Sequence, residues 1–92
     1  MKQEIAEIHA MGMLGWLAGQ AELLPVFLGA TGASEDDLRA RAGEAEFLAS
    51  VVDFVMMDDV WVIDCATDQG WPPEQIMVIR AALPGGDLPA WT

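Results

Sequence analysis

The run of residues 8–21 carries no charged side chain and places the strongest constraint on the fold. Apolar residues and glycines recur there at spacings of three and four, on nearly every side of a helix predicted over residues 3–19. The run is too short and too rich in glycine to cross a membrane, which takes about 20 apolar residues. We therefore expect a central helix that other helices cover, with glycines that let a neighbouring backbone come close.

Glycines and prolines divide the rest of the chain into shorter segments. Their apolar spacing predicts helices over residues 21–30, 34–42, 44–57, 58–69 and 73–83. Ser34 precedes three acidic residues, which indicates an N-cap with acids against the positive end of the helix dipole. Two ion pairs with i,i+4 spacing follow in the favourable order, Glu35 with Arg39 and Asp37 with Arg41. We expect both arginines to be structural.

Residues 51–63 fit two structures. The segments 51–57 and 60–63 are rich in β-branched residues and are separated by two aspartates, which suits two strands joined by a tight turn. The same residues also fit the helices predicted over 44–57 and 58–69, since Glu46, Ser50 and Asp53 fall opposite the apolar face of the first. Periodicity favours the helices but leaves the strands open.

A single helical domain over residues 1–86, followed by a tail at 87–92, accounts for the chain of 92 residues. A domain of this size buries only about 60 to 65% of the surface that its unfolded chain exposes. Yet 53% of the residues are hydrophobic, including four tryptophans and six methionines. The surplus either crowds the core or forms an exposed apolar patch that meets a second chain.

The charge balance is strongly acidic, because 15 acidic residues against four basic ones give a formal net charge of −11. Such a field repels phosphate backbones and anionic lipid headgroups, so we predict no binding to nucleic acid or to a membrane surface. The acids keep a hydrophobic domain in solution and also suit a basic protein partner. Mimicry of DNA ranks last, since the acids are scattered among helix starts.

The two side chains best suited to catalysis are isolated. Cys65 is the only cysteine, so no intrachain disulfide forms. Residues 1–7 also lack the pattern of a secretory signal. We expect a cytoplasmic protein. His9 is expected at the edge of the core, and Cys65 is expected to be a small buried residue whose pKa Asp64 and Asp68 raise.

Metal and nucleotide sites are also unsupported. One histidine and one cysteine cannot supply the four ligands of a zinc site within one chain. The acid pairs Asp36-Asp37 and Asp58-Asp59 lack the spacing of an EF-hand, and their place at helix starts explains them. No glycine-rich loop precedes a lysine. We predict no catalytic residue, no cofactor and no metal.

Four side chains are candidates for an interaction surface. Trp61 faces the side of its helix that carries acidic residues, a setting typical of interfaces. Met56 and Met57 lie beside an acid pair and would form an adaptable apolar rim if exposed. Trp91, in the tail, has no obvious position in the core and either docks into a second chain or has no fixed place.

Six short blocks resemble one known family. They are Leu-Gly-Trp-Leu-Ala at 14–18, Phe-Leu-Gly-Ala-Thr-Gly at 27–32, Asp-Leu-Arg-Ala-Arg-Ala at 37–42, Phe-Leu-Ala-Ser-Val-Val-Asp-Phe at 47–54, Gly-Trp-Pro-Pro-Glu at 70–74 and Leu-Pro-Gly-Gly at 83–86. In this order they are similar to domain of unknown function 3572, a family of short bacterial proteins, over residues 5–86. The resemblance implies an all-helical fold and no assigned activity. The run 60–63 departs from it, because leucine-like helix formers are expected there.

Together these observations predict an all-α fold, a compact array of five or six short helices around the N-terminal helix. With no catalytic set and a surplus of apolar side chains, we expect a non-enzymatic protein–protein interaction or self-association module. Its partner is another protein or a second copy in a homodimer. The alternative is a metal-dependent or accessory subunit whose carboxylates complete a site with another chain.

Overall fold

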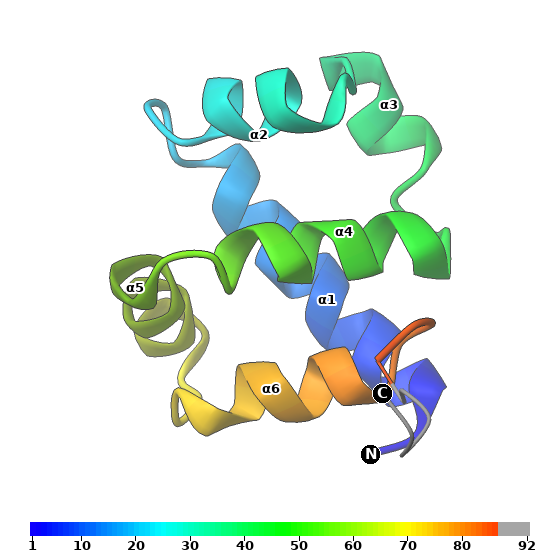
Figure 1. The fold of residues 1–92 in the computed structure, drawn as a ribbon, viewed down its shortest axis with the longest axis vertical. Coiled ribbons are helices and arrows are strands. Elements are labelled where there is room, and N and C mark those ends of the chain that lie inside the picture. Colours follow the sequence, from blue (N-terminus) through cyan, green and yellow to red (C-terminus); the bar gives the residue numbers. More distant parts are fainter. Residues whose placement is uncertain (87–92) are drawn as a thin grey trace.

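The computed structural model describes residues 1–86, which form six helices without a strand (Figure 1). In chain order these are α1 (Gln3–Ala18), α2 (Leu24–Thr31), α3 (Glu35–Ala40), α4 (Ala45–Val55), α5 (Asp59–Gln69) and α6 (Glu74–Ala81). The predicted all-α fold is confirmed. The alternative of two strands over 51–63 is wrong, because these residues belong to α4, α5 and the turn between them. Trp91 and the predicted tail lie outside the described residues.

α1 has the central place that its sequence predicts. It packs against α4, α5 and α6, and α4 crosses it in the middle of the view (Figure 1). α2 and α3 lie at the end of the molecule away from α6 (Figure 1). Among residues 1–86, no helix combines the length and apolar character that crossing a membrane requires.

The core is apolar throughout the described chain, where no polar or charged side chain is buried. α4 supplies much of it. Its predicted apolar face is confirmed by the burial of Phe47, Leu48, Val51, Phe54 and Val55, and Val52 is buried as well. α2 is tied to this face by its one fully buried residue, Phe27. The Phe27 ring lies edge-on to Phe54 and Phe47, with centroid distances of 5.3 and 6.1 Å.

Local capping chemistry sets several helix ends, as predicted. The Asp37 N–H donates to Ser34 Oγ at 3.2 Å while the Ser34 N–H donates to Asp37 Oδ2 at 2.9 Å, which forms a capping box at α3. Asp58 Oδ1 accepts from the Val60 N–H at 2.8 Å and starts α5. Gly70, at φ 78°, ends α5 in the left-handed conformation that glycine adopts without strain.

α2 begins later than the predicted residue 21. Residues 21–23 form a turn, and the helix starts at Leu24, so that Pro25 occupies the first turn, where its missing N–H costs no helical hydrogen bond. Gly32 ends the helix at φ 73°. The late start leaves a five-residue connection, residues 19–23, between α1 and α2.

The two ion pairs predicted on α3 do not form within residues 1–86. The Asp37 carboxylate is occupied by the capping box, and Arg41 instead places Nε 3.1 Å from Glu44 Oε1. The Arg41 guanidinium also lies 4.9 Å from the centroid of the Phe47 ring. Arg41 therefore links the end of α3 to the start of α4, a structural role reached through other partners.

The glycines of α1 do not admit a neighbouring backbone, contrary to the prediction. A Cβ at Gly12 would meet the side chain of Gln69, whose Nε2 donates to the Gly12 carbonyl at 3.3 Å. A Cβ at Gly15 would meet nothing within 4 Å. α1 is also not covered on every side: Ile5 and Ile8 are exposed, because α4, α5 and α6 all pack on its opposite side.

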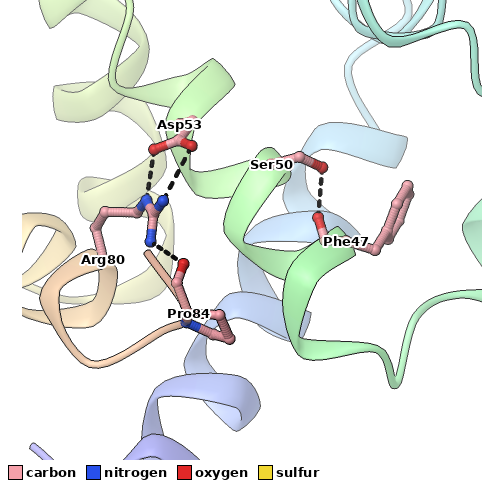
Figure 2. A network of polar contacts seen from close by, with 5 residues as sticks. All are labelled: Phe47, Ser50, Asp53, Arg80 and Pro84. Atoms are coloured by element: carbon pink, nitrogen blue, oxygen red, sulfur yellow. Dashed lines mark hydrogen bonds and ion pairs between the residues drawn. The ribbon is translucent and has the colours of Figure 1, made fainter. Parts of the chain in front are cut away.

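A polar network fastens α6 to α4. The guanidinium of Arg80 faces the carboxylate of Asp53, with Nη2 3.3 Å from Oδ2, and its Nη1 donates to the Pro84 carbonyl at 2.8 Å (Figure 2). One turn earlier in α4, the Ser50 hydroxyl donates to the Phe47 carbonyl at 2.6 Å (Figure 2). The turn after α6 requires a glycine at position 86, because a Cβ there would clash with the Arg80 backbone.

Candidate interaction surface

The turn after α4 and the outer side of α5 expose a row of large apolar side chains. Met57 is 74% exposed, Val60 62% and Ile63 52%. Val60 and Ile63 lie on successive turns of α5, and Met57 precedes them by the same spacing in the turn before the helix, while the buried Cys65 lies on the side of α5 opposite Ile63. We call Met57, Val60 and Ile63 the α5 ridge.

A groove of about 360 Å³ lies on one side of this ridge, between α5 and the start of α6. We call it the methionine groove; its lining residues are Met56, Asp59, Val62, Pro73, Glu74, Ile76 and Met77. Met77 is 64% exposed, whereas Met56 is half-buried. Asp59 and Glu74 bring carboxylates to this otherwise largely apolar groove. Flexible thioether side chains of this kind adapt to differently shaped apolar partners.

A second hollow of about 530 Å³ lies on the other side of the ridge, between α5 and the connection from α1 to α2. Trp16 and Trp61 line it together with Asp64. Each indole ring is fixed by a contact with another side chain. Trp16 Nε1 donates to Asp68 Oδ2 at 2.9 Å, and the Trp61 ring stacks on Phe54 with centroids 4.9 Å apart and an interplanar angle of 21°.

The charge around this surface has one sign. Residues 42–79 contain eight acidic residues and no lysine, arginine or histidine. Of the four basic residues, Arg80 is engaged by Asp53 and Arg41 by Glu44, while Lys2 and Arg39 lie on other elements. The α5 ridge and the methionine groove are therefore a largely apolar surface edged by carboxylates, whereas the second hollow is more polar, since Gln20, Glu22 and Asp64 line it.

Three of the four residues predicted for interaction meet at this place. Met57 is the most exposed of them, Met56 lines the methionine groove, and Trp61 lines the second hollow. Trp91 lies outside the described residues. The exposure of Val60 and Ile63 was missed, although their spacing from Met57 and their position opposite Cys65 could have indicated it.

The residues best suited to catalysis are engaged in packing. Burial, and then the charge of Asp68, raise the pKa of the Cys65 thiol from 9.0 to about 12, so the thiol stays protonated at neutral pH. The His9 ring lies edge-on to Trp71 with centroids 5.0 Å apart, at the edge of the core as predicted. Within residues 1–86, no three acidic, histidine or cysteine side chains are grouped as a metal site would require.

Comparison with known proteins identifies a family. A family model described as "Protein of unknown function (DUF3572)" matches residues 3–86, nearly the whole chain. The chain belongs to this family. The resemblance in six sequence blocks is thereby confirmed, and the α5 ridge and methionine groove are features of a DUF3572 domain. No curated protein and no solved structure shows significant similarity to the chain.

Proposed function

We propose that this domain is a non-enzymatic protein–protein interaction module that binds another protein through the α5 ridge and the methionine groove. The observation that supports this is the row of large apolar side chains left on the outside of a small domain. Met57, Val60 and Ile63 are each more than half exposed, whereas Val51, Val55 and Ile76 of the same chain are fully buried. Single exposed apolar residues are ordinary, but a contiguous row between two hollows is typical of interaction sites.

The anatomy of the surface matches that of a binding site. Protein interfaces place apolar and methionine side chains at the centre and polar groups at the rim. Here the ridge supplies the centre, while Asp59 and Glu74 border the groove and Asp64 borders the second hollow. A rim of carboxylates without cations favours a partner whose own rim carries lysines or arginines.

A site-specific photocrosslinker tests this proposal. It is placed at Met57, in the cells that make the protein, and a matched control carries it at Asp36, which is also exposed but lies on α3. We expect one defined protein adduct from position 57 and none from position 36. The change Val60→Asp should lower the adduct yield about tenfold without lowering the melting temperature, because Val60 packs on little. The proposal fails if position 57 gives no adduct or if both positions give the same ones.

A further inference from the structure

α1 has a second exposed apolar face, separate from the α5 ridge. It consists of Ile5, Ile8, Met11 and Gly15 together with Gly19, the C-cap of the helix, and these residues lie three or four positions apart along one side. Ile8, near the middle of this face, is 67% exposed. We call these five residues the α1 seam.

Within residues 1–86, no neighbouring atom explains why position 15 lacks a side chain. Glycine is the least favourable residue in a helix interior after proline, and it is retained where a backbone must come close. At Gly12 the neighbouring Gln69 explains the missing side chain, whereas nothing lies within 4 Å of a Cβ at Gly15. The open space at Gly15 therefore suits a close approach from outside the molecule.

The distribution of charge on the chain allows a second copy to bind at the α1 seam. A copy of this chain carries a net charge of −11, so two copies repel wherever their carboxylates meet. Residues 8–21 carry no charged side chain, and they form most of the α1 seam. Two copies can therefore meet here without bringing many like charges together.

We propose that two copies of this chain associate through their α1 seams, packed antiparallel about a twofold axis. The large residues of the seam, Ile5 and Ile8, lie in its N-terminal half and the small ones, Gly15 and Gly19, in its C-terminal half. A twofold axis beside Met11 and Gly12 places Ile8 against Gly15 of the second copy and Ile5 against Gly19 of the second copy. Each large side chain then meets the space of a glycine, as a self-complementary interface requires.

A parallel pairing is less favourable. It would set Ile8 against Ile8 and Gly15 against Gly15, which crowds one end of the seam and leaves a gap at the other. The antiparallel seam is a single pair of helices, so it buries less than the about 800 Å² per partner of a standard interface. The dimer is accordingly in equilibrium with the monomer.

Sedimentation equilibrium tests the interface, with wild type measured up to about 1 mM, the weak end of specific association. We expect a mass that rises with concentration from 9.9 kDa toward twice that value. Gly15→Gln should raise the dissociation constant at least tenfold while raising the melting temperature of the dilute monomer, because glutamine favours the helix. Gly29→Gln is the matched control, since Gly29 is also exposed within a helix with nothing within 4 Å of a Cβ. It should raise the melting temperature without changing the dissociation constant.

The proposal is overturned if wild type remains a monomer throughout, or if the two glutamine variants weaken association equally. Both results leave the α5 ridge and the proposed function unaffected, because the photocrosslinking experiment does not depend on α1.

Oxidative crosslinking tests the direction of packing, since Cys65 is fully buried and does not interfere. Met11→Cys should form a disulfide dimer, because the two copies of residue 11 lie beside the axis. Ile5→Cys should not, because two copies of residue 5 are then about 20 Å apart along the helices, far beyond disulfide reach. Crosslinking of Ile5→Cys at the same rate would refute the antiparallel arrangement.

Discussion

Replacing Trp61 with alanine should destabilise the fold rather than affect binding alone. Its ring is half-buried and stacks on Phe54 at 4.9 Å. If the ring buries roughly 100 Å² of apolar surface at about 25 cal/mol per Å², its burial contributes about 2.5 kcal/mol, and the aromatic pair adds about 1 kcal/mol. A domain of this size has a free energy of unfolding of roughly 5–14 kcal/mol, so the loss is a substantial fraction.

Thermal unfolding followed by circular dichroism measures this effect. A loss of about 3.5 kcal/mol lowers the melting temperature of a domain of this length by about 14–28 °C. Trp61→Phe keeps an aromatic ring on Phe54 and should retain most of the stability, whereas Met57→Ala should cost about 0.5 kcal/mol or less, because Met57 is 74% exposed. A melting temperature for Trp61→Ala within 2 °C of wild type, on the scale of about 4–8 °C per kcal/mol, would refute this account of the contact.

Three further results are expected. Since the unfolded chain releases the Cys65 proton near its ordinary pKa of 9.0 and the folded chain only near 12, wild type should lose stability as the pH rises between these values. Urea midpoints at about pH 8 and pH 10.5 should therefore differ more for wild type than for Cys65→Ala, and equal differences would contradict this. Asp58→Ala should cost about 1 kcal/mol in chemical denaturation through loss of the α5 cap, and Asp58→Asn should restore it. Calorimetric titration with Mg²⁺ or Mn²⁺ should give no heat; saturable binding would instead favour the alternative of a metal-dependent accessory subunit.

Helix ends were the most predictable part of the fold, because the groups that set them act within one turn. Ser34, Asp58 and Gly70 each cap a helix through their own side chain or backbone freedom, so the sequence alone identifies them. The start of α2 was less predictable, since Pro25 is compatible with more than one first turn. Residues 60–63 are helical although their β-branched side chains favour a strand. The cap at the start of α5 and the packing of α5 on α4 and α1 stabilise the helix there.

The candidate surface depends on contacts between helices, and there the sequence is less informative. A low density of charges predicted that α1 is central, but it could not predict which side remains open, because that depends on where α4, α5 and α6 pack. For the same reason Trp61 was identified as a surface candidate, while its stacking on Phe54 depends on the angle between α4 and α5. Met57 was correctly placed beside the acids of α5, since its position in the turn is a local property.

Salt concentration should separate the two proposed interfaces, because they use charge in opposite ways. The α5 ridge is edged by carboxylates and suits a basic partner, so added salt screens an attraction and weakens that complex. The α1 seam joins two copies of charge −11 through a nearly uncharged face, so added salt screens their mutual repulsion and strengthens the dimer. Between about 50 and 500 mM NaCl, the Debye length shortens from roughly 14 to 4 Å. Over this range we expect the dissociation constant of the dimer to fall, and that of the complex with the partner identified by photocrosslinking to rise. A dimer that weakens with salt would require ion pairs between copies, which the α1 seam cannot supply, and would place the contact elsewhere on the molecule.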